Sequence, residues 1–302
     1  MKKWQPFVLI LAVIAGAFWG SVGPFVRYMS GHGISSLTIL ASRVLVAALL
    51  LGLGMLVVNR SWLKVKWKDL WIFLVAALVG MLGLNVCYNE AIGYVPLSLA
   101  AILLGLYPIF VMILAALFFK EKITRRKIFC MALALAGAVL ASGLLESGQT
   151  SFSAYGVAVG FVSAIFYAFY SIMSKVAMQR NYNVFTVTFY ALLIMGIALI
   201  PFTDWQALGS FVAEAPLGHA GFMVGHSACA SVLPYILFTL SLRYADAGKT
   251  SILAAGMEPI SALILGFLIY RETPTALALL GMAITIVALA LVGMAEKKKT
   301  SA

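Results

Sequence analysis

The sequence predicts an all-α integral membrane protein in which ten transmembrane helices form two inverted five-helix repeats. Of its 302 residues, 63% are hydrophobic and only 10% are charged, which is far from the composition of a water-soluble domain. Apolar stretches of about 20 residues, the length of helix that crosses the hydrocarbon of a bilayer, recur from end to end. The two halves of the chain also share proline and polar residues at matching positions.

Five spans are predicted in the first half, at residues 7–29, 35–57, 70–91, 97–119 and 128–145. In the first span, Trp19 lies among closely spaced glycines and Pro24 predicts a kink or hinge. The second span carries Arg43, which lies too deep to reach the membrane surface easily. Its guanidinium therefore needs a carboxylate, from the protein or from a substrate. In the third span, Asn85 and Asn89 fall on one helix face, as a solute path or a helix contact would require.

The fourth span contains Tyr107 directly before Pro108. The proline ring removes one backbone donor and frees the carbonyl four residues earlier. Tyr107 offers a hydroxyl and a flat apolar face, which suits either a cavity wall or ordinary packing. The fifth span follows a basic segment, KEKITRRK, and carries no deep charge.

Five further spans are predicted in the second half, at residues 154–178, 184–202, 218–242, 250–270 and 276–294. The sixth span of the chain has a hydroxyl-bearing stripe that includes Tyr167, Tyr170 and Ser171, which suits cavity lining or helix packing. The seventh is uniformly apolar. His226 in the eighth is either a proton carrier or, as we expect, a histidine bonded to a backbone carbonyl. The tenth is uniformly apolar.

The ninth span holds Glu258 beside Pro259 in more than twenty otherwise uncharged residues. A deep ionisable side chain costs at least about 2.5–3.5 kcal/mol on insertion scales, so it needs a partner or water. Small residues share its helix face, and Pro259 frees the carbonyl of Ala255. The pair predicts a polar notch at mid-membrane depth, where Glu258 binds a proton or solute; a structural carboxyl bonded between helices is the alternative.

The net charge of +11 reflects orientation in the membrane and gives no support to nucleic-acid binding. With the N-terminus in the cytoplasm, most of the 21 lysines and arginines fall in or beside cytoplasmic segments. An even number of spans then places both termini in the cytoplasm. The three cysteines lie within spans at unrelated spacings, which argues against disulfides or a zinc site.

The two halves, 1–148 and 149–302, are predicted to be duplicates. Arg27 follows Trp19 at the spacing at which Lys175 follows Tyr167, and YPIFVMILAALFFKE aligns without a gap to EPISALILGFLIYRE. Because each half holds an odd number of spans, the second copy enters the membrane inverted. Inverted repeats are one architecture of secondary transporters, with the substrate site near the midplane.

Charged residues also match at the ends of the repeated spans. Arg27 and Lys175 are expected to be snorkelling anchors at opposite membrane faces. Glu121 and Glu272 follow their spans beside a basic residue. We interpret them as ion pairs that cap loops or close a gate.

The chain resembles the EamA branch of the drug/metabolite transporter superfamily over essentially its full length. The residues that carry the resemblance are FWGSVGPFVRYMS in the first span and the segments LYPIFVMILAALFFKE and MEPISALILGFLIYRE. Span six departs from the pattern with Tyr167 where its counterpart has Trp19. The resemblance implies a multi-pass permease or exporter of small metabolites, amino acids or drugs in a bacterial inner membrane, with a central cavity lined by both halves.

The sequence therefore predicts a secondary transporter that exports a small organic solute by alternating access, either coupled to protons or running as an exchanger. The expected partners are this solute and the lipid bilayer, and the expected state is a monomer, with a dimer as the alternative. The predicted cavity residues are Trp19, Arg43, Asn85, Tyr88, Asn89, Tyr107, Tyr167, Tyr170, Ser171, Glu258 and Ser261. The proton-coupling candidates are Glu258, His226 and Glu90, and the hinge candidates are Pro24, Pro108, Pro234 and Pro259.

Other functions lack their motifs. The sequence has no G-x-x-x-x-G-K-[ST] phosphate loop for ATP-driven pumping and no H-E-x-x-H or spaced Cys/His cluster. We therefore expect no cofactor, no metal and no catalytic residues. An uncoupled facilitator or obligate exchanger of the same fold is the main alternative, and a membrane enzyme or lipid-handling scaffold is a third.

Overall fold

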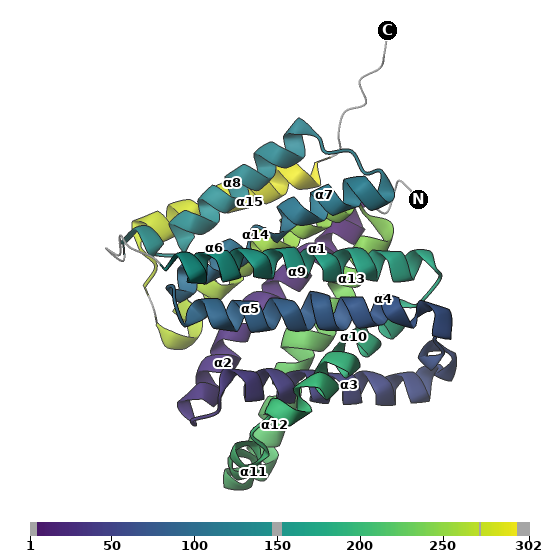
Figure 1. Ribbon diagram of the computed structural model, residues 1–302. Coiled ribbons are helices and arrows are strands. Elements are labelled where there is room, and N and C mark those ends of the chain that lie inside the picture. The colour runs from purple at the N-terminus through teal and green to yellow at the C-terminus, as the bar shows by residue number, and fades with distance from the viewer. Residues whose placement is uncertain (1–4, 147–152, 272, 295–302) are drawn as a thin grey trace.

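The computed structural model describes residues 5–146, 153–271 and 273–294, and these form an all-helical bundle (Figure 1). Helices account for every regular element in these ranges. The α-helices of the first half are α1 Gln5–Gly20, α2 Val22–Gly31, α3 Ser36–Val58, α4 Leu70–Leu74, α5 Gly83–Ile92, α6 Leu97–Leu104, α7 Tyr107–Phe119 and α8 Arg125–Ala141. Those of the second half are α9 Ala154–Gln179, α10 Val184–Leu199, α11 Trp205–Glu214, α12 Pro216–Ser227, α13 Leu233–Tyr244, α14 Ala247–Tyr270 and α15 Ala276–Gly293.

Nine helical stretches in the described ranges are long and apolar enough to cross a membrane. The remaining predicted span corresponds to α8, whose 17 residues lie at the short end of the spanning range. The predicted boundaries agree with the helix ends to within a few residues. One helix was not predicted: α11 lies in the polar segment between the seventh and eighth predicted spans. Together with α12 it protrudes from the bundle next to α3 (Figure 1).

The four prolines proposed as hinges affect their helices differently. The first span breaks at Ser21, three residues before Pro24, and the fourth breaks between α6 and α7, where Pro108 occupies the first turn of α7. Pro234 stands in the first turn of α13, directly after a π-helical segment, η7 Ala228–Val232. The helix α14 continues without a break through Pro259.

The directions of neighbouring helices follow from which residues meet. In α8 and α15, Arg126 bonds the carbonyl of Leu291, whereas Gly137 lies against Gly281 and Thr285. These two helices are therefore antiparallel, and Figure 1 shows them side by side.

The helices α3 and α10 are also antiparallel. The hydroxyl of Thr38, near the start of α3, accepts from the Asp204 amide just beyond α10, while Gly52 lies against Phe189. The helix α9 runs antiparallel to α5, because Gly156 meets Tyr94 and Gly80, in the segment before α5, meets Tyr170.

A glycine pair lets α1 pack closely on α14. A Cβ atom on Gly16 would lie 2.3 Å from the carbonyl oxygen of Ala254, and one on Gly20 would lie 1.9 Å from Ser261 Oγ and 2.5 Å from the carbonyl oxygen of Glu258. Real Cβ atoms do not approach other atoms so closely. The two helices run parallel, and α1 packs on the part of α14 that carries Glu258.

Replacing Gly20 by alanine is expected to destabilise the protein by about 1–3 kcal/mol, because the added methyl group overpacks this contact. Thermal unfolding of the detergent-purified protein measures the effect. Gly23→Ala is the matched control, since a Cβ there meets nothing within 4 Å. Equal melting temperatures for the two variants would show that the close approach of α1 and α14 is not needed for stability.

Candidate functional site

Glu258 lies among aromatic side chains inside the bundle. Its carboxylate interacts electrostatically with the hydroxyl groups of four tyrosines from four helices, Tyr88 of α5, Tyr107 of α7, Tyr167 of α9 and Tyr235 of α13. Three of these tyrosines are buried, whereas Glu258 and Tyr88 are half-buried. The carboxylate thus faces the protein interior.

Tyr107, which aligns with Glu258 in the predicted repeat, bonds directly to the helix that carries Glu258. Its hydroxyl donates to the carbonyl oxygen of Ser251 at 3.0 Å. Its ring centroid lies 4.1 Å from that of Tyr167. Tyr107 therefore links α14 to the aromatic side chains of α9.

Trp19 of α1 forms one wall of the aromatic group. Its indole makes edge contacts with Tyr235 and Phe238, each with ring centroids 5.3 Å apart, and with Tyr167 at 5.9 Å. Behind this wall the hydroxyl of fully buried Tyr170 lies 3.1 Å from Thr239 Oγ1. Rings from α1, α9 and α13 thus form one packed aromatic group, and Tyr167 and Tyr235 of this group are within electrostatic range of Glu258.

Tyr235 and Phe238 were not among the predicted site residues. In the sequence they are ordinary aromatic residues of an apolar span, and the only signal is that Tyr235 follows Pro234. Their position in the site depends on how α13 packs against α1 and α9.

Arg43 of α3 projects into the interior without a protein carboxylate as its partner, which was one of the two alternatives expected. Within the described ranges, no ion pair joins it to Glu258 or Glu90, and its Nε atom is buried without a hydrogen-bond partner. The guanidinium is close enough to interact electrostatically with Tyr235 and His226. Tyr235 is within electrostatic range of both Arg43 and Glu258.

The two other proton-coupling candidates lie in different surroundings. His226 is buried, and its ring stacks on Phe25 with centroids 4.9 Å apart. Its Nε2 atom has no hydrogen-bond partner among the described residues, so this atom does not make the expected bond to a backbone carbonyl. Glu90 is exposed at the end of α5 and accepts a long hydrogen bond of 3.4 Å from Tyr155.

The remaining candidate residues make local bonds. Asn85 is half-buried and donates to the carbonyl of Met81 at 2.7 Å, and Asn89 is half-buried one turn later. Ser171 is buried and donates to the carbonyl of Tyr167 at 3.1 Å. Ser261 donates to the carbonyl of Glu258 at 3.0 Å and fills the contact with α1. Both serines therefore support the backbone next to the aromatic group.

A network of partly buried charges lies at the end of the bundle where α14 begins. Lys175 of α9 pairs with Glu121, and Glu121 also accepts from the backbone amide of Ala247 at 3.0 Å. Asp246 pairs with Lys127 at 2.6 Å. The expectation that Lys175 is a snorkelling anchor is wrong, because the side chain is only 12% exposed and its ammonium group pairs with Glu121 inside the protein. The matching Glu272 lies outside the described residues.

The two carboxyl groups of this network differ in pKa. Burial raises the pKa of Glu121, and the nearby Asp246 raises it further although Lys175 opposes this effect. Burial also acts to raise the pKa of Asp246, but hydrogen bonds from Lys127 and the Lys249 amide hold it below its usual value. A carboxyl with a lowered pKa stabilises the fold above the pKa of the unfolded chain and loses that contribution as the pH falls through the folded value.

Asp246→Asn is therefore expected to lower stability at pH 7 by about 2 kcal/mol, because it leaves Lys127 without its charged partner. The amide can still cap α14, so the change removes the charge and keeps the cap. The difference in melting temperature between wild type and variant should shrink as the pH falls below about 4. A difference that stays constant from pH 7 to pH 3 would contradict the role of the ion pair.

Comparison with known proteins agrees with this architecture. The chain is 27% identical to an uncharacterized transporter of Archaeoglobus fulgidus over 97% of this chain and 99% of the relative. It is 26% identical to a probable terminal-alkyne amino-acid exporter of Streptantibioticus cattleyicolor, over 95% of this chain and 92% of the relative. It is also 26% identical to the pseudopaline exporter CntI of Pseudomonas aeruginosa, over 93% of each chain.

A solved crystal structure has the same fold, with a TM-score of 0.77 at 14% identity over 94% of this chain and 95% of the other. The EamA-like transporter family matches residues 6–143 and, a second time, residues 154–294. These two matches cover most of the sequence and confirm the resemblance noted from its motifs. The chain is a multi-pass membrane protein that belongs to the EamA-like transporter family.

Proposed function

We propose that the ten helical spans form two inverted five-helix repeats, residues 1–148 and 149–302. Counterpart helices support this arrangement, since α8 is antiparallel to α15 and α3 to α10, as a twofold axis in the membrane plane requires. Both repeats contain a π-helical segment in the third span, η4 Val75–Leu82 and η7. Both fourth spans end in a left-handed residue, Lys120 and Arg271. The double family match supports the same division; the boundary itself lies outside the described residues.

The solute that this site fits is a small zwitterion of the amino-acid type. The observation that carries this proposal is that Arg43 and Glu258, two opposite charges inside the bundle, are not paired with each other or with any other described residue. Unpaired charges in a membrane interior are costly and are characteristic of ion and substrate paths. A solute carboxylate would bind Arg43, and its ammonium group would bind Glu258.

The aromatic group between these charges suits the rest of such a solute. Trp19, Tyr107, Tyr167 and Tyr235 offer ring faces for an apolar side chain and, with the buried hydroxyls, polar groups for orientation. The name of one relative, an amino-acid exporter, favours the same solute class. We infer that this protein exports an amino acid or a similar carboxylate-bearing amine.

Transport would proceed by alternating access in the inner membrane, with both termini in the cytoplasm. The network of Lys175, Glu121, Lys127 and Asp246 would close the cytoplasmic end, because it ties α9 and the α7–α8 connection to the start of α14. Binding of a proton to Glu258 would compete with binding of the ammonium group and couple export to proton entry. The protein would act as a monomer surrounded by lipid.

Thermal unfolding with three matched ligands tests the solute class. The ligands are a free amino acid such as leucine, its amide, which lacks the carboxylate, and its desamino acid, which lacks the ammonium group. A ligand that binds only the folded protein raises the melting temperature. We expect the best amino acid of a panel to stabilise the protein and both truncated forms to fail. Equal stabilisation by all three forms would exclude a site that recognises both the carboxylate and the ammonium group of the solute.

A further inference from the structure

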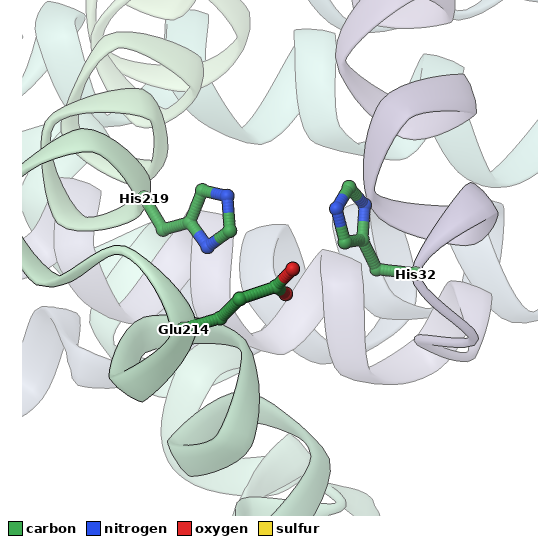
Figure 2. A group of neighbouring side chains, drawn as sticks. All are labelled: His32, Glu214 and His219. Atoms are coloured by element: carbon green, nitrogen blue, oxygen red, sulfur yellow. The ribbon is translucent and has the colours of Figure 1, made fainter.

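A cluster of two histidines and a glutamate lies at the end of the bundle away from the cytoplasmic ion network. His32 follows α2, Glu214 ends α11, and His219 lies in the first turns of α12. Their side chains point toward one another (Figure 2), and one nitrogen or oxygen ligand atom from each lies within 4.8 Å of the others. His32 and Glu214 are exposed, whereas His219 is 7% exposed.

Hydrogen bonds fix which nitrogen of each histidine is free. His32 Nδ1 lies 2.9 Å from the carbonyl oxygen of Tyr28, and His219 Nδ1 bonds the carbonyl oxygen of Phe211. Because a carbonyl oxygen only accepts, each neutral imidazole carries its proton on Nδ1 and keeps a lone pair on Nε2. Metal-binding histidines are commonly held in this way, with the second ring nitrogen bonded to a backbone carbonyl.

We propose that His32, Glu214 and His219 bind a divalent transition-metal ion of the Zn²⁺ type. Two imidazoles and one carboxylate are a known ligand set for Zn²⁺, whereas Mg²⁺ and Ca²⁺ prefer oxygen ligands alone. Metal–ligand distances of about 2.0–2.2 Å place tetrahedral ligand atoms about 3.3 Å apart. The exposed side chains of His32 and Glu214 can close the remaining gap by rotating toward His219, which is held by stacking on Phe211 with ring centroids 3.9 Å apart.

The Tyr28 hydroxyl lies 3.2 Å from His219 Nε2 and donates to it in the absence of metal. A metal ion bound to His219 Nε2 would coordinate its lone pair and displace the Tyr28 hydroxyl. The bound ion joins the end of α2, in the first half of the chain, to the α11–α12 hairpin of the second half. It therefore fastens the first span, which carries Trp19, to the opposite repeat on the outer side of the proposed orientation.

Calorimetric titration of untagged, chelator-treated protein in detergent with ZnSO₄ tests the site. We expect one Zn²⁺ to bind per chain and to raise the melting temperature, with no effect from equal concentrations of Mg²⁺ or Ca²⁺. His32→Gln and Glu214→Gln change exposed side chains, and each is expected to weaken Zn²⁺ binding about tenfold or more. Their melting temperatures without metal should equal that of wild type, which shows that the variants fold.

Two further variants distinguish Zn²⁺ binding at this cluster from Zn²⁺ binding elsewhere on the chain. His226→Gln removes the only other histidine of the chain and should leave Zn²⁺ affinity unchanged. Tyr28→Phe removes the competing hydroxyl and should leave the affinity equal or higher. Zn²⁺ affinity that is unchanged in both His32→Gln and Glu214→Gln, or lost in Tyr28→Phe, would overturn the assignment.

Discussion

In proteoliposomes, Glu258→Gln is expected to reduce solute flux about 10–100-fold and to remove its dependence on an imposed pH gradient. Glutamine has the size of glutamate but carries no charge and exchanges no proton. A hydrogen bond to a charged group contributes about 1.5–3 kcal/mol, and a loss of that size weakens binding about 10–100-fold. The tyrosines around residue 258 should keep their packing, because the substitution preserves the shape of the side chain.

Glu146→Gln is the control for this experiment, since Glu146 is exposed and is not one of the residues of the candidate site. It should transport like wild type at every pH. Flux by Glu258→Gln that equals wild type and follows the pH gradient in the same way would reject the proton role. Reduced flux without any response of wild type to the gradient would favour an exchanger over a proton-coupled transporter.

Arg43→Met is expected to abolish high-affinity solute binding and to leave the protein as stable as wild type or more stable. A buried charge without a partner destabilises the fold, and an apolar side chain of similar length removes this cost. Binding should weaken about 10–100-fold, because the solute carboxylate loses its bidentate partner. A substitution that raises stability and weakens binding is characteristic of a residue that serves function at a cost in stability.

Arg60→Met, at an exposed arginine beyond the end of α3, is the matched control. It should change neither property by more than about 0.5 kcal/mol. Thermal unfolding and ligand titration on the same preparations measure both quantities. If Arg43→Met lowers the melting temperature by several degrees and binds solute normally, the guanidinium is a structural group.

The helical spans could be predicted from the sequence because the length of apolar segments and the polar residues between them are local properties. The effect of each proline was less predictable. Pro24 and Pro108 lie at helix breaks, whereas α14 passes through Pro259. The close packing of α1 on α14 through Gly16 and Gly20 supports the segment of α14 on both sides of Pro259. Such packing is a tertiary property and leaves no local signal.

The site was predicted in part for the same reason. Glu258 and Arg43 stand out because charge in an apolar span is expensive, and Tyr107 was identified through its repeat counterpart. Tyr235 and Phe238 could not be distinguished from other aromatic residues of a membrane helix. The cluster of His32, Glu214 and His219 could not be found from the sequence, because His32 is distant from the other two residues and only the packing of the α11–α12 hairpin against the end of α2 brings the three side chains together.

Efflux of radiolabelled amino acids from proteoliposomes tests most directly whether the site binds and exports a zwitterion. Vesicles loaded with a panel of labelled amino acids and their amides would contain wild type, Arg43→Met, Glu258→Gln or no protein. We expect that wild type releases at least one free amino acid faster than protein-free vesicles, that its amide stays inside, and that both variants release it about tenfold more slowly or less. Release of every compound at the protein-free rate, or equal release by wild type and both variants, would contradict this function.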